Sequence, residues 1–481
     1  MDPKTQTIID LFGQINAIPR CSKNEAAICQ WLEQWAGDHG FPVRRDAAGN
    51  LVIDVPATPG YESAPLVVLQ GHVDMVCEKR PDVAHDFTKD PITLVTDGDW
   101  LKADGTSLGA DNGIAVALAM ALATDDTIAR PPMELLMTVD EETGLTGAME
   151  LKPGFVTGRI LLNVDSEDEG VFTVGCAGGK DATLSLKLET SPVPEAWSFF
   201  RLAASSMQGG HSGIDIAKHR ANANKILARA LDHLRLHHDV RLVEVAGGTV
   251  HNAIPREAAA VFANPADVDA LKALLAPLEQ ALRSEYRATE PGMRLTLTGE
   301  APAAAATAVS PEQSRRIIDL IMALPTGVSE FSPDIDGLVE TSNNLAVVKT
   351  TDGRLEVLSS QRSSVPSRLT GICRRVESIA GLAGAEISWD TGYPPWPPDM
   401  ASPLLGRCKD VYRDTFNKTP VVEIIHAGLE CAVIGSVYPG MDMISFGPTM
   451  ENPHSPDERL YLPSVENIWK FLVALLASFK V

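Results

Sequence analysis

The chain has 481 residues, which is too long for one ordinary hydrophobic core, so we expect two domains. Hydrophobic residues make up 44% of the chain and charged residues 22%, which is typical of a folded globular protein. The formal net charge of -22 argues against nucleic-acid partners and against an anionic membrane surface, because both would require a basic face.

The amino-terminal segment and the cysteines bear on the compartment. The first residues lack a basic region followed by a long apolar run, so no signal peptide is predicted. The longest apolar stretch, residues 113–123, is too short to span a bilayer. The 7 cysteines are scattered singly without a CxxC pair, which favours a reduced protein in the cytoplasm.

Four short apolar runs, each followed by polar residues, predict strands. Runs of this length without clean alternation are typical of strands that are buried on both faces of a parallel-type α/β sheet. Between the first two runs, residues 113–123 predict a helix that begins next to Asp111 and Asn112. The four runs are residues 65–69, 133–139, 160–164 and 443–446.

The middle of the chain, from about residue 181 to residue 390, has a different pattern. Alternating residues predict strands there, and amphipathic helices lie among them. The proline-rich segment that follows, residues 393–398, predicts a stiff connector. The predicted strands include 182–188 and 294–298, and the predicted helices include 221–236 and 311–324.

These patterns predict a domain interrupted by an insertion. We expect an α/β domain with a mixed, largely parallel sheet, formed by residues 1–186 together with residues 391–481. Residues 187–390 would form an inserted α+β domain, whose length of roughly 200 residues is a typical domain size.

Histidines and carboxylates follow the predicted strands. In open α/β sheets, ligands bind beyond the carboxyl ends of the strands, so we expect these side chains at one edge. Two histidines with several carboxylates make a nitrogen and oxygen site that suits divalent metals, zinc and manganese especially. In chain order, the residues are His72, Asp74, Asp140, Glu141, Glu142, Asp165 and His454.

Each of these residues also has an ordinary structural interpretation. His72 and Asp74 could form a surface pair, and Asp111 could cap the helix that follows it. Residues 140–142 could be a solvated acidic turn, and His454 a loop histidine. The metal hypothesis is favoured because separate strand ends carry the same kind of ligand, and their carboxylates would repel one another without cations.

Whole sequence blocks resemble the M20 metallopeptidase family, and most closely its dipeptidase branch. The resemblance implies a zinc-peptidase catalytic domain with an inserted lid domain, and hydrolysis of dipeptides of broad specificity, Xaa-His included. It also implies two divalent metal ions, with zinc as the first candidate and manganese or cobalt as alternatives. A homodimer that forms through the lid domain is a further possibility for this family. The blocks are LQGHVDMV, SLGADNGIAVA, TVDEETGLTGA, LLNVDSEDEG, GGHSGIDIAKHRANANK, HNAIPRE, SSQRSS, GYPPWPPD, HAGLECAVIG and FGPTMENPHSPDE.

The family pattern implies a role for each metal-ligand candidate. Asp111 would be the carboxylate that bridges the two metals. His72 and Asp165 would complete one metal site, and Glu142 and His454 would complete the other.

Two further acidic residues match catalytic positions of the family. Asp74 would hold the unligated nitrogen of His72 and so fix its tautomer. Glu141 would be the general base, which takes a proton from the attacking water and later protonates the leaving amine.

The inserted domain and the segment after it supply the candidates for substrate contact. His211 would stabilise the oxyanion, or else it is a turn histidine between glycines. Arg362 would grip the terminal carboxylate of the substrate, or else it is a surface arginine. Glu430 would recognise a free amino terminus, or else it forms a structural ion pair. The remaining candidates for substrate contact are Asn252, Arg256 and His426.

Two other functions remain open at this point. The same chemistry could act on N-acyl amino acids, and capping the substrate amine would then favour the reaction instead of abolishing it. Alternatively, the chain could be a metal-binding scaffold without catalysis. Against the scaffold, every matched core catalytic position carries a competent residue.

Overall fold

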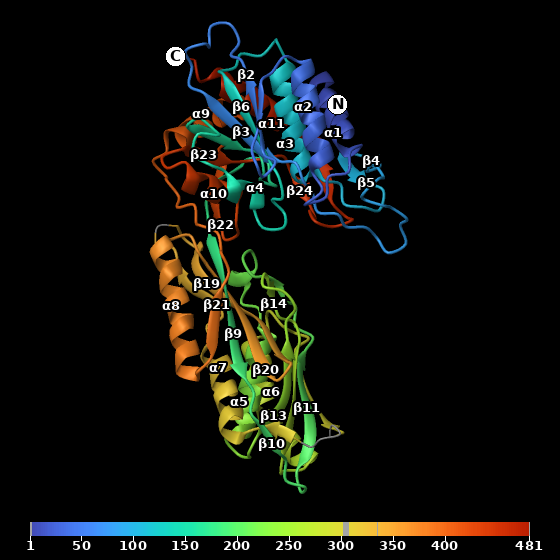
Figure 1. Ribbon diagram of the computed structural model, residues 1–481, viewed down its shortest axis with the longest axis vertical. Coiled ribbons are helices and arrows are strands. Elements are labelled where there is room, and N and C mark those ends of the chain that lie inside the picture. The colour runs from blue at the N-terminus through green and yellow to red at the C-terminus, as the bar shows by residue number, and fades with distance from the viewer. Residues whose placement is uncertain (1, 302–306, 334, 481) are drawn as a thin grey trace. The chain divides into compact units, whose positions relative to one another are not determined.

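The structure is a computed structural model that describes residues 2–301, 307–333 and 335–480. It contains two compact units, which Figure 1 draws. The first unit consists of Met1–Cys176, Trp396–Ile424 and Leu429–Val481, and the second of Ala177–Pro395 and Ile425–Gly428.

The main part of the second unit begins at residue 177 and ends at residue 395, whereas the sequence analysis set these limits at residues 187 and 390. The short segment Ile425–Gly428, which the second unit also contains, was not predicted to belong to it. The difference at the start arises because the long strand β9 (Gly178–Lys187) pairs in the sheet of the second unit from its first residue, where Gly178 lies opposite Ser363. A hydrophobic pattern alone does not show to which sheet a strand adds.

The first unit carries both ends of the chain. Its helices are α1 (Pro3–Asn16), α2 (Ala26–Asp38), α3 (Ala110–Thr124), α4 (Thr146–Glu150), α9 (Pro403–Phe416), α10 (Glu430–Val437) and α11 (Leu462–Ala477). Its strands are β1 (Val43–Arg45), β2 (Leu51–Val55), β3 (Val67–His72), β4 (Leu94–Asp97), β5 (Trp100–Ala103), β6 (Met133–Thr138), β7 (Ile160–Asn163), β8 (Val171–Cys176), β22 (Val421–Ile425), β23 (Asp442–Ser445), β24 (Met450–Glu451) and β25 (Arg459–Tyr461).

An 8-stranded sheet organises the first unit, in the order β1-β2-β6-β3-β7-β23-β8-β22. Its four neighbouring strands β6, β3, β7 and β23 pair in parallel, whereas β1, β2 and β8 join by antiparallel pairing. These four strands are the four apolar runs of the sequence. The α/β prediction with a mixed sheet is therefore confirmed, and the parallel part is the centre of the sheet.

The central strands are buried on both faces. Every residue of β3 and of β6 is buried, so helices must cover both sides of the sheet. Helix α3 packs on β3, while α9 and α10 pack on β23. The strands carry a few buried polar side chains, such as Gln70 and Thr138, but most of the acidic residues near them follow the strand ends.

The start of α3 departs from helical geometry. Asp111 and Asn112 have non-helical backbone angles, and the N-cap residue is Gly109, which has no side chain to cap the helix. The buried amide of Asn112 instead donates from Nδ2 to Val164 O at 2.6 Å, and Asn112 Oδ1 accepts from His72 N at 3.3 Å. These bonds tie the beginning of α3 to the ends of β7 and β3. The alternative that Asp111 is an ordinary helix cap is therefore wrong.

The second unit is an α+β domain. Its strands are β9, β10 (Thr190–Pro192), β11 (Ser198–Ser205), β12 (Gly210–His211), β13 (Arg241–Gly247), β14 (Ala253–Ile254), β15 (Ala258–Asn264), β16 (Arg294–Glu300), β17 (Thr307–Val309), β18 (Gly327–Phe331), β19 (Val339–Thr351), β20 (Arg354–Ser363) and β21 (Glu386–Trp389). Its helices are the short 3-10 helix η1 (Ile216–Lys218), α5 (Ala223–Arg235), α6 (Val268–Glu285), α7 (Pro311–Ala323) and α8 (Pro366–Ala383).

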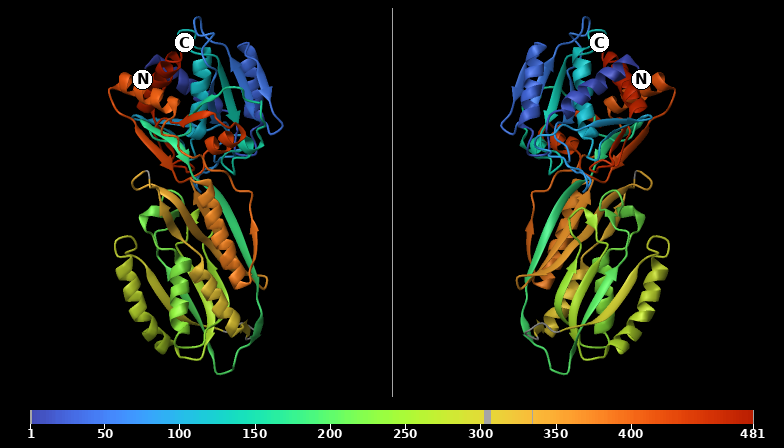
Figure 2. Two further views of the ribbon diagram at one scale, coloured as in Figure 1. Left: turned by 90° about the vertical axis from the view of Figure 1, so that its left-hand side faces the viewer. Right: turned by 90° about the vertical axis from the view of Figure 1, so that its right-hand side faces the viewer.

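A 9-stranded antiparallel sheet forms the base of the second unit, in the order β16-β11-β15-β13-β19-β20-β9-β21, with β18 beside β19. Helices α5, α6, α7 and α8 pack on one face of it, as Figure 2 shows, and bury their apolar sides in one core with the sheet. The two helices predicted in this region are α5 and α7. Within the described part of the chain, no helix is long and apolar enough to cross a membrane.

Candidate metal centre

The parallel strands of the first unit bring five predicted ligands together. His72 is the last residue of β3, Glu142 follows β6, and Asp165 follows β7. Asp111 lies at the start of α3, and His454 lies in the loop between β24 and β25. Because β3, β6, β7 and β23 run in the same direction, the segments after them meet at one edge of the sheet.

Three groups of side chains in this cluster could each hold a metal ion. Two of them share Asp111, and the third consists of His72, Glu141 and Glu142. In the first group, His72 Nε2 lies 3.0 Å from Asp111 Oδ1 and 3.4 Å from Asp165 Oδ1. In the second group, His454 Nε2 lies 3.0 Å from Asp111 Oδ2 and 2.9 Å from Glu142 Oε2. The two oxygens of one carboxylate thus face two different histidines, which is the arrangement a bridging ligand requires.

The residues present fit divalent metals. Buried Glu142 Oε1 has no hydrogen-bond partner in the described structure, and Asp165 Oδ1 makes no well-formed hydrogen bond although His72 is near. A buried polar oxygen without a partner is costly, and a cation would remove that cost. Imidazole nitrogens with carboxylate oxygens are ligands that zinc and manganese accept. The candidate ligands are therefore chemically and sterically suited to hold metal ions.

Charge and burial perturb these groups strongly. Burial raises the pKa of Asp165 to about 6, with His72 opposing the shift. Burial alone would lower the pKa of His454, but its hydrogen bonds with Asp111 and Glu142 raise that pKa to about 11. The carboxylates that raise this pKa would equally attract a divalent cation.

Asp74 is completely buried behind His72. Its Oδ1 lies 3.3 Å from His72 Nδ1, the ring nitrogen that faces away from Asp111 and Asp165. The same carboxylate accepts the backbone N–H groups of Glu141 at 3.1 Å and Glu142 at 3.2 Å. Asp74 therefore orients His72 and, at the same time, the turn that carries the next two acidic residues.

Glu141 lies beside the cluster, and its carboxylate belongs to neither of the two groups that share Asp111. Burial raises its pKa well above the usual value, and although His72 opposes the shift, the negative charges of Asp165 and Glu142 add to it. Glu141 does form a third possible ligand group with His72 and Glu142, but the two groups that share Asp111 are complete without it. A carboxyl group with a high proton affinity beside a metal site is equipped to accept and return a proton.

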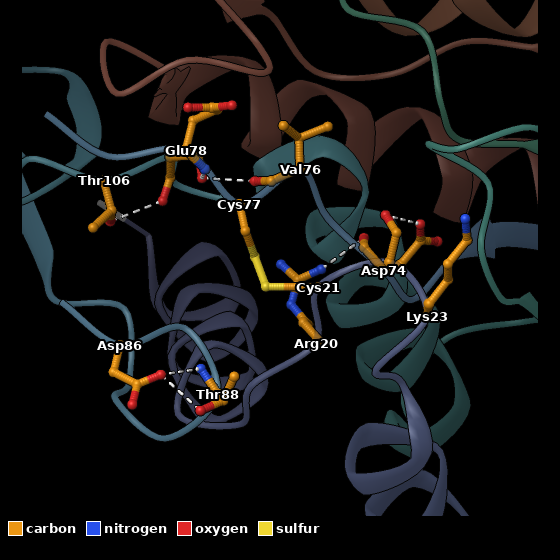
Figure 3. Close-up of a disulfide and its surroundings, with 12 residues drawn as sticks. Arg20, Cys21, Lys23, Asp74, Val76, Cys77, Glu78, Asp86, Thr88 and Thr106 are labelled. Carbon is orange, nitrogen blue, oxygen red and sulfur yellow. Dashed lines mark hydrogen bonds between the residues drawn. A yellow bond between two sulfur atoms is a disulfide. The ribbon is translucent and has the colours of Figure 1, made fainter.

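A disulfide that the sequence analysis did not predict lies near Asp74 (Figure 3). Cys21 and Cys77 are 56 residues apart in the chain, yet their Cα atoms are 5.7 Å apart. The prediction of a fully reduced chain is therefore wrong for this pair. Only the fold brings the loop after α1 beside the loop after β3, where Met75 N also donates to Arg20 O at 3.1 Å.

Two buried charges that support the site were also missed. The guanidinium of Arg20 donates to the carbonyl oxygens of Val73 and Asp74 at 3.1 and 3.0 Å. The carboxylate of Glu458 accepts backbone N–H groups next to Asp111. The block FGPTMENPHSPDE contained Glu458, but nothing in the sequence indicated its partner.

Glu430 does not fit either of its predicted roles. It is 0% exposed, and its Oε2 accepts hydrogen bonds from Gln70 Nε2 at 2.5 Å and Thr138 Oγ1 at 2.7 Å. Burial raises its pKa to about 7, with His72 opposing the shift. It has no ion pair with a described residue and no exposed surface for a substrate amine. Its hydrogen bonds instead link the start of α10 to Gln70 on β3 and Thr138 on β6.

In the second unit, the ring of His211 is oriented by backbone groups. Its Nδ1 accepts the N–H groups of Gly213 at 3.3 Å and Ile214 at 3.2 Å. In the neutral ring the proton therefore sits on Nε2, which makes that nitrogen a donor. Pairing of β12 with β14 places His211 opposite Ala253, so the structure brings His211 and Asn252 into neighbouring positions. Arg256 is exposed, and its side chain lies against Gly209.

Arg362 is buried, at 6% exposed, so the surface alternative for it is wrong. Its Nη1 donates to Tyr393 Oη at 2.7 Å, while its Nε has no hydrogen-bond partner in the described structure. Neighbouring β19 presents Ser342 opposite Arg362, and the Ser342 hydroxyl lies 2.7 Å from His426 Nε2. Burial, with the charge of Arg362 adding to it, lowers the pKa of His426 to about 3, so His426 is neutral. The sequence pattern predicted only a stiff connector at Tyr393 and gave no sign of this contact with Arg362.

Comparison with known proteins gives consistent matches. The model of Peptidase family M20/M25/M40 matches residues 68–478. The chain is 43% identical over 472 residues to the cytosol non-specific dipeptidase of Escherichia coli (strain K12), covering 98% of this chain and 97% of that protein.

Solved structures agree with these matches. Aminoacylhistidine dipeptidase from Vibrio alginolyticus is 41% identical, with a TM-score of 0.89, and the match covers 98% of this chain and 96% of that one. Aminopeptidase PepT from Bacillus cereus ATCC 10987 has a TM-score of 0.58 over 99% of this chain and 98% of that one, but at 15% identity it shows likeness of fold alone.

Proposed function

We propose that this chain, which belongs to peptidase family M20/M25/M40, is a dipeptidase that depends on divalent metal ions. The observation that carries the proposal is the pair of ligand groups that share Asp111. They occur in a chain that is similar over 98% of its length to proteins named as dipeptidases. The substrates would be dipeptides of broad specificity, Xaa-His included.

The proposed centre holds two divalent ions, zinc in the first place. His72 and Asp165 would bind one ion, Glu142 and His454 the other, and Asp111 both. Supporting this assignment, Asp111 Oδ1 lies 3.0 Å from His72 Nε2, and Asp111 Oδ2 lies 3.0 Å from His454 Nε2. When bound, the ions supply Lewis-acid polarisation of the scissile carbonyl and acidify the attacking water.

Glu141 is proposed as the general base and later the general acid. Its carboxylate would take the proton of the attacking water and then deliver it to the leaving amine, so that the peptide C–N bond breaks and a neutral amine departs. The raised pKa of Glu141, which follows from its burial and the neighbouring carboxylates, suits both halves of this transfer. Asp74 lies 3.3 Å from His72 Nδ1 and would thereby leave Nε2 of the same ring to bind a metal ion.

His211 is proposed to stabilise the oxyanion of the substrate. The two backbone N–H groups on its Nδ1 support this role, because they leave the proton on Nε2, where it can be donated. Asn252, adjacent to the partner strand of His211, and Arg256 are proposed as further substrate contacts.

Arg362 is proposed to bind the terminal carboxylate of the substrate. Its support is a buried guanidinium with an unused Nε–H, next to the neutral ring of His426, whose Nδ1 also lacks a hydrogen-bond partner in the described structure. A bidentate carboxylate would satisfy such donors, and a longer peptide chain would not present one there. This contact would explain a preference for dipeptides.

We also propose a homodimer through the second unit. Strand β16 stands at the end of the sheet order, and most of its residues are exposed. An exposed edge strand offers unpaired backbone groups to a second copy of the chain. Light scattering of the full chain tests this proposal, and a monomeric mass at micromolar concentration would contradict it.

A cytoplasmic location is proposed because the E. coli relative is named a cytosol dipeptidase. Cell fractionation with detection of the chain tests the location. Recovery from the membrane or secreted fraction would contradict it.

The function is tested with a substrate panel on the metal-loaded protein. We expect hydrolysis of free dipeptides, loss of hydrolysis when the amine is acylated or the carboxylate amidated, and poor cleavage of tripeptides. Preferential cleavage of N-acyl amino acids would favour the acylase alternative, and no cleavage of any member would favour the scaffold.

A further inference from the structure

The carboxylate of Glu458 collects a row of backbone N–H groups. Oε2 accepts from Leu108 N at 2.7 Å and Gly109 N at 2.9 Å. Oε1 accepts from Ala110 N at 2.8 Å and Asp111 N at 3.3 Å. Glu458 is 2% exposed, so these bonds form away from water, and both of its oxygens are occupied. It therefore has no oxygen left to serve as a metal ligand.

The carbonyl groups of the same segment are held from the other side. Asn16 Nδ2 donates to Leu108 O at 2.9 Å, and Arg20 Nη2 donates to Gly109 O at 2.5 Å. Asn16 and Arg20 are joined to each other by a bond of 3.0 Å from Arg20 Nη2 to Asn16 Oδ1. Residues 108–111 are thus held from two sides. The carboxylate of Glu458 accepts their N–H groups, while Asn16 and Arg20 donate to the carbonyl oxygens of Leu108 and Gly109.

Glu458 also lies in the loop that carries His454, one of the proposed metal ligands. It lies between β24 and β25 in the same loop as His454, whose Nε2 is 3.0 Å from Asp111 Oδ2. Its carboxylate therefore joins the loop of one ligand to the backbone of another. An ordinary helix cap satisfies N–H groups of its own helix end, whereas this carboxylate comes from a residue 347 positions later than Asp111.

We propose that Glu458 is a positioning residue of the metal centre, which sets the placement of the shared carboxylate of Asp111 relative to His454. The inference rests on the two-ion site proposed above. Loss of the Glu458 carboxylate would free the His454 loop from residues 108–111, and the ion between Asp111, Glu142 and His454 would be held less tightly than the other.

The test is a Co²⁺ titration of the metal-free full chain, followed by visible absorption and calorimetry, for native protein and Glu458→Gln. The glutamine keeps the size of the side chain but offers one acceptor oxygen instead of two. We expect affinity for one of two Co²⁺ equivalents to fall on the order of 10-fold or more, with a changed absorption band. Dipeptide hydrolysis should lose kcat with little change in KM.

The matched control is Asp457→Asn, which changes the neighbouring carboxylate in the same loop. Asp457 is 68% exposed in its side chain and pairs with Arg80, so its loss should leave the Co²⁺ titration unchanged. Native affinity and native absorption in folded Glu458→Gln would overturn the proposal, even if that variant unfolded at a lower temperature.

Should Glu458→Gln not fold, Glu458→Asp takes its place. Its charge remains, but the shorter side chain cannot reach all four N–H groups, and one weakened Co²⁺ equivalent is again expected. Native Co²⁺ binding in Glu458→Asp would overturn the proposal. If the native chain bound two Co²⁺ ions but cleaved no dipeptide, the proposed function would fail while the Co²⁺ comparison still decided the role of Glu458.

Discussion

The two units gather their candidate residues in different ways. In the first, parallel strands end at one edge, and five predicted ligands from separate segments form two groups whose ligand atoms lie within 4.8 Å of one another. In the second, the sheet is antiparallel, and the candidates lie on a small two-stranded ladder, on β20 and in connecting segments. Parallel pairing makes the convergence of strand ends predictable from sequence order, whereas antiparallel pairing does not.

The largest effect should come from the residue on which the centre of the first unit depends. Asp111→Ala is expected to lose both metal ions and all turnover, because one carboxylate serves both groups. Glu142→Ala should weaken chiefly one of the ions. Metal analysis after dialysis measures this difference, and two full equivalents in Asp111→Ala would refute the bridge.

The next largest effect is expected for Glu141 in the same unit, where turnover should be lost while metal binding is kept. Glu141→Ala should keep two metal equivalents while kcat falls on the order of 100-fold to 10,000-fold, since a general base is removed and no ligand is lost. The measurements are kcat and metal content on the same sample. If metal content fell along with kcat, Glu141 would have to be regarded as a ligand.

The second unit should show a smaller effect that leaves the metals in place. His211→Ala is expected to lower kcat on the order of 100-fold or more, because the Nε2–H donor to the oxyanion is lost. Metal content should stay at the native value. An unchanged kcat would return His211 to the status of a turn histidine.

A weaker effect, on binding, is expected at Arg362. Arg362→Lys should raise KM about 10-fold, since a point charge replaces a guanidinium fork at a charge-assisted contact. An amidated dipeptide should be a poor substrate for the native chain and lose little more with the variant, because both changes remove one contact. Equal cleavage of amidated and free dipeptides by the native chain would contradict carboxylate binding.

The smallest effect on turnover is expected at the disulfide. Cys21→Ser should lower the free energy of unfolding by about 2–4 kcal/mol, because the 56-residue separation is no longer closed in the unfolded chain. Turnover should stay near the native value, since Arg20 still holds the carbonyl groups of Val73 and Asp74. A large loss of kcat in the folded variant would show that the disulfide orders the metal centre.

Particular residues show which parts of the fold and of the metal centre could be predicted from the sequence. The four central strands and the cluster around Asp111 were accessible, because apolar runs and the ligands after them are local patterns. Glu458 was not, since its partners lie about 350 positions earlier and any buried carboxylate could have many such partners. Tyr393 and Cys21 were missed because nothing in the local sequence indicates their partners, Arg362 and Cys77, which only the fold brings near. The burial of Glu430 became visible only with the packing of α10.

The central claim is that two ions, held through Asp111, make the chain a dipeptidase. Its most direct test is a titration of the metal-free full chain with Zn²⁺, in which bound metal and hydrolysis of a free dipeptide are measured together. The account predicts no hydrolysis without metal and saturation of binding at two equivalents per chain. Hydrolysis by the metal-free chain, or saturation at one equivalent, would contradict it.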